Sequence, residues 1–315
     1  MQLLELKQDE AGAILSAMKN VATMDGELGM SALERRTLDA FQRLILGTSH
    51  DVDELPGRRR RDLGRVLSDR TLRRDAVRMM VVMAMVDKKV HRRKTAQVFE
   101  TAAALGVHDD ALNMLDEVSD GEYLGAARIA LGHVLREYWT EGERPGVRDW
   151  IEVLLVGSRN LPGDDDVRRR YMRLRNYADG TLGHSLYHHY RDNDFEMPGE
   201  PGAVGERLVP HEIYHVLGGY GTDNIGEMQV AAFCGPAKKH PVDALLLSMI
   251  GAHLGAKSYL RKAYGVFDPE LVFRAMRRGM CMTRDLDANW SWWSNMDAPV
   301  DELRRSLGVP DAAAA

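Results

Sequence analysis

The chain has 315 residues, of which 44% are hydrophobic and 28% are charged, and its formal net charge is −5. This composition is typical of a globular protein that is long enough for two domains. The longest apolar run, Met79 to Val86, has eight residues, well short of the roughly 20 that a membrane-spanning helix needs. The acidic start MQLLELKQDE lacks the basic region of a signal peptide and predicts a cytoplasmic location. Cys234 and Cys281 are too few for a disulfide-rich scaffold.

Apolar residues recur at helical spacing through residues 1 to 120, as Leu15, Met18 and Val21 illustrate. Residues 22–28 align with residues 84–90 at an offset of 62 positions. Each copy passes from an apolar helix into a charged turn and then into another helix. The pattern indicates a duplicated helix pair.

This repeated turn resembles the one in the TerB-like domain of tellurite-resistance proteins, where an ADGE-type turn followed by acids is a proposed metal site. Asp25, Glu27 and Glu34 match that pattern in the first copy, whereas only Asp87 matches it in the second. A hard cation needs six or more oxygen ligands, so we expect these acids to cap helices instead. We interpret residues 1–125 as a TerB-like helical module with an interaction or regulatory role.

Positive charge is concentrated between Gly57 and Lys94, where 14 Lys and Arg stand against 4 Asp and Glu. The segment therefore carries +10 and the rest of the chain −15. Acids at positions 62, 69, 75 and 87 interrupt the run, which favours solvated helix faces over a surface for anionic lipid headgroups. No finger motif, aromatic stacking pattern or glycine-rich binding loop accompanies the basic residues, so we expect no nucleic-acid partner.

Turn signals at residues 120–121, 141–146 and 160–166 separate this half from the next. We place the domain boundary near residue 125, which makes residues 126–315 a second helical domain. A Pro- and Gly-rich loop at residues 191–207 directly precedes that domain's main motif. Such a loop is a candidate lid.

The motif HEIYHVLGGYGTDNIGE, residues 211–227, is the segment richest in candidate metal ligands. His211 and His215 are four residues apart and so share one helical face. Pro210 suits the start of that helix, and the glycines that follow the motif's second histidine end it. A second helix, capped by one of the polar residues after the glycines, would run back and bring Glu227 level with the histidines.

Two imidazoles and one carboxylate leave coordination positions open, which suits catalytic zinc or non-haem Fe(II) better than a closed structural site. We therefore expect a divalent transition metal, iron or zinc, held by His211, His215 and Glu227. Glu212 is a candidate fourth ligand or catalytic base. The competing interpretation is an accidental HExxH pattern with Glu227 an ordinary surface carboxylate.

The HExxH pattern alone also suggests a zincin metallopeptidase, in which Glu212 would activate a water molecule. A metzincin would have a third histidine at position 221, which is Gly221. Most zincins with a glutamate ligand place that residue farther along, on a separate helix. No convincing edge strand for a peptide substrate precedes the motif, so this alternative is disfavoured.

Residues 211–227 resemble the signature of the Coq-four family of ubiquinone biosynthesis proteins, which reads His-Asp-x-x-His, eleven residues, then Glu. Glu212 stands here in the place of the family's Asp. GTLGHSLYHHY at 180–190 is similar to the family's Gly-His segment ahead of an aromatic helix, and APVDELRRSLGV at 298–309 resembles its closing helix. The resemblance covers roughly residues 130 to 310.

Membership of that family would imply an all-α, usually dimeric protein that depends on a metal and handles polyprenylated quinone precursors. The proposed reaction is oxidative loss of the ring carboxylate with hydroxylation at that carbon. The implied partners are a prenylated precursor or other isoprenoid lipid, a second copy of the chain, quinone-biosynthesis enzymes and the inner membrane face. A non-catalytic lipid-binding scaffold is the alternative from another functional class.

Three histidines, His184, His188 and His189, crowd the helix expected before the motif. His184 and His188 share the four-residue spacing of the motif pair, but no carboxylate occupies a comparable hairpin position. We expect a polar or packing role for them. His184 matches the family segment and is kept as a candidate catalytic group beside the metal.

Two further apolar features follow the motif. Residues 242–260 predict an apolar helix whose Gly251 and Gly255 allow close packing or room for a lipid tail. Trp290, Trp292 and Trp293 cannot all face inward from one helix, which predicts that at least one lies at a membrane interface or subunit contact. The sequence as a whole predicts an all-α protein of two helical domains, the second built around a metal-binding helical hairpin.

Overall fold

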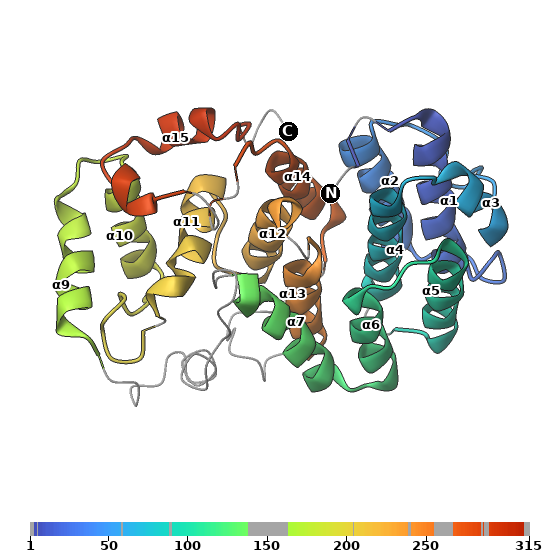
Figure 1. Cartoon of the computed structure of the whole chain (residues 1–315), viewed down its shortest axis with the longest axis horizontal. Coiled ribbons are helices and arrows are strands. Elements are labelled where there is room, and N and C mark those ends of the chain that lie inside the picture. Colours follow the sequence, from blue (N-terminus) through green and yellow to red (C-terminus); the bar gives the residue numbers. More distant parts are fainter. Residues whose placement is uncertain are drawn as a thin grey trace.

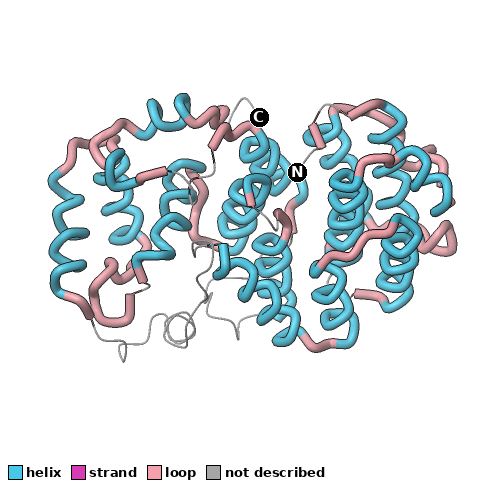
Figure 2. Tube along the Cα trace, in the orientation of Figure 1, coloured by secondary structure: helices cyan, strands magenta, loops and turns pink. Residues whose placement is uncertain are grey.

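The computed structural model describes residues 3–4, 6–57, 59–87, 90–137, 163–203, 205–238, 241–254, 267–284, 286 and 290–311. Within these ranges every regular element is a helix, which confirms the predicted all-α class (Figure 2). The β-type contact found there is one isolated bridge between Thr181 and Pro299. The turns predicted at 141–146 and at 160–162 lie outside the described residues.

The helices fall into an N-terminal and a C-terminal group (Figure 1). The N-terminal helices are α1 (Gln8–Thr23), α2 (Ala32–Phe41), η1 (Gln42–Leu46), α3 (Arg60–Val66), α4 (Arg70–Met85), α5 (Arg92–Leu105) and α6 (Asp110–Asp120). The C-terminal helices are α7 (Tyr123–Glu137), α9 (Asp165–Met172), η2 (Arg173–Asn176), α10 (Leu182–Asp192), η3 (Glu206–Leu208), α11 (Val209–Gly218), α12 (Asn224–Cys234), η4 (Gly235–Ala237), α13 (Asp243–Leu254), α14 (Pro269–Met280), η5 (Trp292–Asn295) and α15 (Val300–Ser306).

Helix α4 forms the core of the N-terminal group. The apolar run Met79 to Val86 lies in and just after it, and none of these residues is more than 4% exposed. The helix packs against α1, α5 and α6, so burial on several sides accounts for the run. No helix among the described residues has the length and apolarity that crossing a bilayer requires.

The acids of the repeated turn cap a helix or form ion pairs. Glu34 forms a reciprocal capping box with Ser31 at the start of α2, with N–H to oxygen distances of 2.7 and 3.1 Å, which confirms the predicted capping role for this acid. The buried ammonium of Lys94 contacts both Glu34 and Asp87. A lysine thus supplies positive charge between carboxylates from the two repeat copies.

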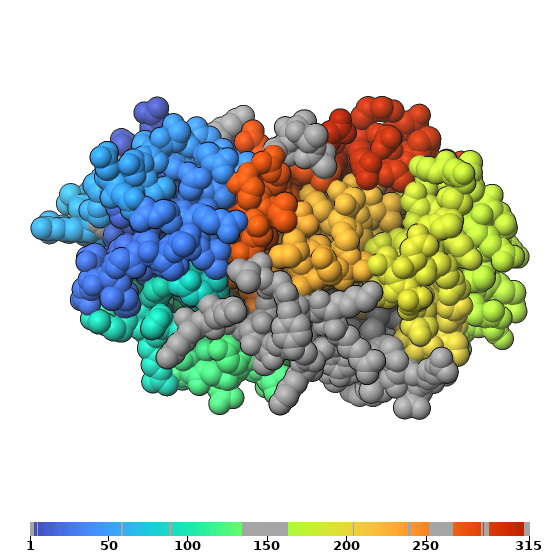
Figure 3. Space-filling model, turned by 180° about the vertical axis from the view of Figure 1, so that it is seen from behind, coloured from blue at the N-terminus to red at the C-terminus, as the bar shows by residue number. Residues whose placement is uncertain are grey.

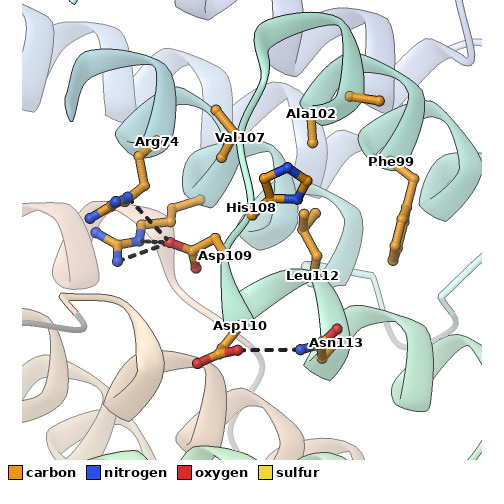
Figure 4. Close-up of a pocket in the computed structure, with 11 residues that line it drawn as sticks. Arg74, Phe99, Ala102, Val107, His108, Asp109, Asp110, Leu112 and Asn113 are labelled. Carbon is orange, nitrogen blue, oxygen red and sulfur yellow. Dashed lines mark hydrogen bonds and ion pairs between the residues drawn. The ribbon is translucent and has the colours of Figure 1, made fainter. Parts of the chain in front are cut away.

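A cavity of about 800 Å³ opens between α4, α5 and α6 (Figure 4). Phe99 and Leu112 form part of its apolar lining. On its polar side Arg78 lies 3.0 Å from Asp109, and Arg74 approaches the same carboxylate at 3.9 Å. Ion pairs of this kind account for part of the basic segment. Arg78 is buried in its pair, so it does not belong to a solvated helix face.

The two groups of helices are in contact along α7 and α14. His133 on α7 bridges them, with Nδ1 2.6 Å from Asp243 of α13 and Nε2 3.2 Å from Asp110 of α6. Helix α14 packs between α2 and α12, where Glu270 pairs with Arg43 at 2.7 Å. Figure 3 shows this orange helix beside the blue N-terminal residues. The division of the chain at residue 125 stays a prediction.

The tryptophans at positions 290, 292 and 293 pack on the C-terminal group itself. The rings of Trp292 and Trp293 are tilted with centroids 4.6 Å apart, and Trp293 meets the Tyr171 ring edge-on at 5.1 Å. Arg170 lies over Trp293, 5.0 Å from its centroid. Trp290 is also half-buried against the core. A membrane or subunit role for these residues stays a prediction.

Other sequence predictions have mixed outcomes. Both cysteines were expected to be buried apolar groups rather than a disulfide. Both are free, and Cys234 is buried, whereas Cys281 is exposed. The predicted apolar helix is described as α13 up to Leu254, and Gly255 lies outside the described residues. In the candidate lid loop, Arg191 pairs with Glu200 at 2.8 Å, which anchors the middle of the loop to α10.

Helix α14 approaches α12 closely at Gly279. A β-carbon built on Gly279 would lie 1.9 Å from the carbonyl oxygen of Phe233, whereas one on Gly251 of α13 meets nothing within 4 Å. We expect Gly279→Ala to lower the free energy of unfolding by roughly 1–3 kcal/mol because two helices must move apart. Gly251→Ala, the matched control, should be neutral or stabilising by about 0.5–1 kcal/mol. Urea denaturation measures both, and equal effects would contradict the packing.

Candidate metal centre

The predicted helical hairpin is present as α11 and α12. Pro210 lies in the first turn of α11, where its missing N–H costs no hydrogen bond. The helix ends at Gly219, whose φ of 71° is in the left-handed region that glycine adopts readily. Of the three polar residues that could have started α12, Asp223 is the N-cap, and its side chain accepts a 2.8 Å hydrogen bond from the Gly226 N–H.

Gly226 lets the turn close tightly over the first turn of α12. A β-carbon at this position would lie 1.9 Å from the carbonyl oxygen of Gly221, which no side chain could tolerate without moving the backbone. The next residue in the chain is Glu227. The tight closure therefore fixes where its carboxylate stands relative to α11.

Three side chains of the hairpin converge on one point. The Nε2 atoms of His211 and His215 are 3.2 Å apart. Glu227 places Oε2 3.3 Å from Nε2 of His211 and Oε1 3.4 Å from Nε2 of His215. Among the described residues this is the group of three potential ligands whose donor atoms lie close enough together to share one ion.

These separations fit a transition metal. In a tetrahedral site with bonds of about 2.1 Å, neighbouring ligand atoms are about 3.4 Å apart, and in an octahedral site about 3.0 Å. The three measured distances, 3.2, 3.3 and 3.4 Å, lie within this interval. Two imidazole nitrogens and one carboxylate are the donor set that zinc and non-haem iron share.

Backbone geometry prepares the His215 ring for binding. Its Nδ1 atom is 3.3 Å from the carbonyl oxygen of Tyr220, so in the neutral ring Nδ1–H donates to that oxygen. The lone pair then resides on Nε2, which faces His211 and Glu227. This is the tautomer that a metal ligand requires.

Exposure differs across the group and gives it an open side. The side chain of His215 is 1% exposed and that of Glu227 16%, whereas that of His211 is 33% exposed. Solvent and small molecules therefore reach the group past His211. A site with protein on one side and access on the other matches catalytic rather than structural metal sites.

The ligand group is electrostatically coupled. Although burial lowers the basicity of an imidazole, the Glu227 carboxylate raises the pKa of His211 to about 9. Burial likewise opposes ionisation of Glu227, but hydrogen bonds from His211 and His215 lower its pKa to about 2. Without a metal, a protonated imidazole attracts the Glu227 carboxylate and keeps it beside the histidines.

Glu212 and His184 lie outside this group. Oε2 of Glu212 accepts a 2.7 Å hydrogen bond from Nε2 of His189, and this bond, with His211 and His215 nearby, lowers its pKa against the opposing effect of burial. His184 contacts Asp179 at 3.2 Å, and its ring is tilted against that of His188 with centroids 4.5 Å apart. The ligand or base role of Glu212 and the catalytic role of His184 stay predictions.

His189 of α10 reaches the hairpin. It contacts Glu212 and stacks on His215 with ring centroids 5.2 Å apart, which is in keeping with the polar or packing role expected for it. Helical periodicity indicates this placement. Leu182, Leu186 and Tyr190 form the buried face of α10, and position 189 falls beside them, three residues after Leu186, whereas position 184 does not.

Two arginines that the sequence analysis did not single out hold the C-terminal end of α11. Arg278 of α14, 3% exposed, donates to the carbonyl oxygen of Gly218 at 2.8 Å and to the Tyr220 hydroxyl at 2.7 Å. Arg304 of α15 donates to the carbonyls of Leu217 and Val216 at 2.9 and 3.1 Å. Cations at a helix C-terminus satisfy its last carbonyls and oppose its dipole.

Comparison with solved structures finds a distant likeness. The chain matches no known protein-family model and no curated protein. It is similar to the crystal structure of a candidate ubiquinone biosynthesis protein from Nostoc punctiforme, with a TM-score of 0.34 and 20% sequence identity over 75% of this chain and 98% of that one. A TM-score this low establishes neither a shared fold nor a shared function, so family membership stays a prediction from the motifs.

The metal-free protein tests the coupling directly. We expect His211 to titrate near pH 9 rather than 6.5, because Glu227 stabilises its charged form. The stabilisation is complete below pH 6.5 and is lost as the pH rises through 9. Glu227→Gln should return the pKa toward its ordinary value. NMR titration of the imidazole resonances measures both, and a wild-type value near 6.5 would contradict the geometry.

Proposed function

We propose that this chain is a metal-dependent protein of prenylated quinone biosynthesis. It binds a polyprenylated aromatic acid and acts in replacing the ring carboxylate by a hydroxyl. The convergence of His211, His215 and Glu227 around one point, open on the His211 side, is the observation that carries the proposal. The resemblance of residues 211–227 to the Coq-four signature supplies the substrate class.

The proposed overall change is an oxidative decarboxylation. The bond between the ring and its carboxyl carbon breaks, and the carbon leaves as carbon dioxide. A carbon–oxygen bond forms at the same position with an oxygen atom from water, while dioxygen accepts the two electrons and is reduced to hydrogen peroxide. An iron ion bound by two histidines and one carboxylate would supply the chemistry that activates dioxygen beside a substrate. In this account His211, His215 and Glu227 hold the ion and leave the solvent side for the reactants.

A nearby cation supports an acidic substrate. The ammonium of Lys238 lies over the Tyr214 ring, 5.2 Å from its centroid, and its charge lowers the pKa of His211. Its positive charge therefore acts on the metal group, and it would also stabilise the negative charge of an aromatic carboxylate bound there.

We further propose that the protein meets its lipid substrate at the inner membrane face and works as a homo-oligomer alongside other quinone-biosynthesis enzymes. A polyprenyl chain is confined to the bilayer, so an enzyme that acts on the head group must approach the surface.

Metal content tests the site. Purified wild-type protein, supplemented with iron or zinc, should bind about one equivalent of transition metal per chain. His215→Ala should lose most of it because the best-buried ligand is removed. His50→Ala is the matched control, because His50 is exposed and belongs to the N-terminal group. This variant should keep the wild-type metal content. Elemental analysis that finds no bound metal in either wild type or control would reject the site.

Substrate turnover tests the reaction. We expect the iron-loaded protein to convert a prenylated hydroxybenzoic acid to the corresponding phenol with release of carbon dioxide, and only in the presence of dioxygen. Glu227→Gln should abolish this by weakening iron binding. Iron binding without any turnover, together with prenyl-lipid binding that survives His211→Ala, would identify a scaffold. Zinc-dependent peptide cleavage that Glu212→Gln abolishes would identify a peptidase.

A further inference from the structure

We infer that His189 is a positioning residue of the metal centre, holding the His215 ring in its ligating orientation by stacking on it while Glu212 fixes His189 in turn. The inference rests on the proposed metal site but not on the proposed reaction. It assigns a function to Glu212 that differs from metal ligand or base. It also makes α10 part of a site whose motif lies entirely on α11 and α12.

The contacts around His189 define this role. Its ring stacks on that of His215 with centroids 5.2 Å apart and an angle of 28° between the planes. Its Nε2 atom lies 2.7 Å from Oε2 of Glu212. The His189 side chain is 9% exposed and that of Glu212 is 13% exposed. A hydrogen bond to an ionised group this well buried is stronger than one at the surface.

Helix α10 is itself fastened to the hairpin turn. Asn193 donates from Nδ2 to the carbonyl oxygen of His189 at 2.8 Å. Its Oδ1 accepts a 2.6 Å hydrogen bond from the hydroxyl of Thr222, which lies in the turn between α11 and α12. The Phe195 ring meets His189 edge-on at 6.0 Å. The imidazole of His189 is therefore in contact with the Glu212 carboxylate, the His215 ring and the Phe195 ring.

Two restraints together fix the His215 imidazole. The carbonyl oxygen of Tyr220 bonds its Nδ1 atom in the ring plane, and the stacked His189 ring lies against its face. The first sets the tautomer and the second limits rotation of the ring. An imidazole fixed in this way loses little rotational freedom when it binds a metal, so the restraint raises affinity.

Glu212 closes the arrangement because it shares α11 with both histidine ligands. Its bond to His189 ties α10 to the helix that carries His211 and His215. A carboxylate buried at this position needs a partner, and His189 provides one. The side chain between the two ligands in the sequence therefore supports them through a second helix.

Three variants separate stacking from hydrogen bonding. His189→Ala removes both, His189→Phe keeps a ring against His215, and His189→Gln keeps a donor for Glu212. His188→Ala is the control, since that side chain is 49% exposed and points to Asp192. Cobalt(II) serves as the probe because its visible absorption reports ligand geometry, and competition with a chelator gives its affinity. Circular dichroism confirms that each variant is folded.

We expect His189→Ala to weaken cobalt binding roughly 10- to 100-fold, and His188→Ala to leave it unchanged. His189→Phe should keep the wild-type absorption spectrum, whereas His189→Gln should shift it because the His215 ring is freed. If the alanine variant does not fold, the Phe and Gln variants carry the test.

Wild-type spectrum and affinity in both the Ala and Gln variants would overturn the inference and leave the metal site intact. A wild-type protein that binds no cobalt would overturn the metal site and the inference together.

Discussion

The attraction between the Glu227 carboxylate and the two imidazoles of α11 is the constraint on which the site depends. It acts across a turn that closes only because Gly226 lets the backbone approach within a distance that excludes a side chain. In the metal-free state a proton on His211 pairs with the Glu227 carboxylate. This pairing raises the pKa of His211 and lowers that of Glu227. A divalent ion would replace that proton with a stronger positive charge and use the same geometry.

The rest of the C-terminal group supports that hairpin from outside. Arg278 and Arg304 hold the last carbonyls of α11 from α14 and α15, and His189 holds its first turn from α10. These contacts come from helices that are far apart in the sequence. The short motif therefore provides the candidate ligands, while three further helices determine how rigidly these side chains are held. Motif spacing alone would overstate how much of the site lies in residues 211–227.

The sequence predicted the all-α class, the hairpin and the meeting of its three ligands, because helical periodicity, Pro210 and the glycines act locally. It did not predict which contacts reach the site over long distances. Arg278 and Arg304 resemble any other surface arginine in the sequence, since their carbonyl partners lie 60 and 87 residues away. His184 was preferred to His189 because family likeness outweighed the buried face of α10. The lysine that sits between Glu34 and Asp87 was likewise unforeseen, because its partners are brought together only by packing.

X-ray absorption spectroscopy of the metal-loaded protein tests the central claim most directly, because it reports the atoms bound to the ion rather than an effect of binding. The account predicts a first shell of nitrogen and oxygen at about 2.0–2.2 Å with the outer-shell scattering of two imidazoles. A shell that contains sulfur, or one with no imidazole scattering, would contradict it, since the hairpin would then not be where the metal binds.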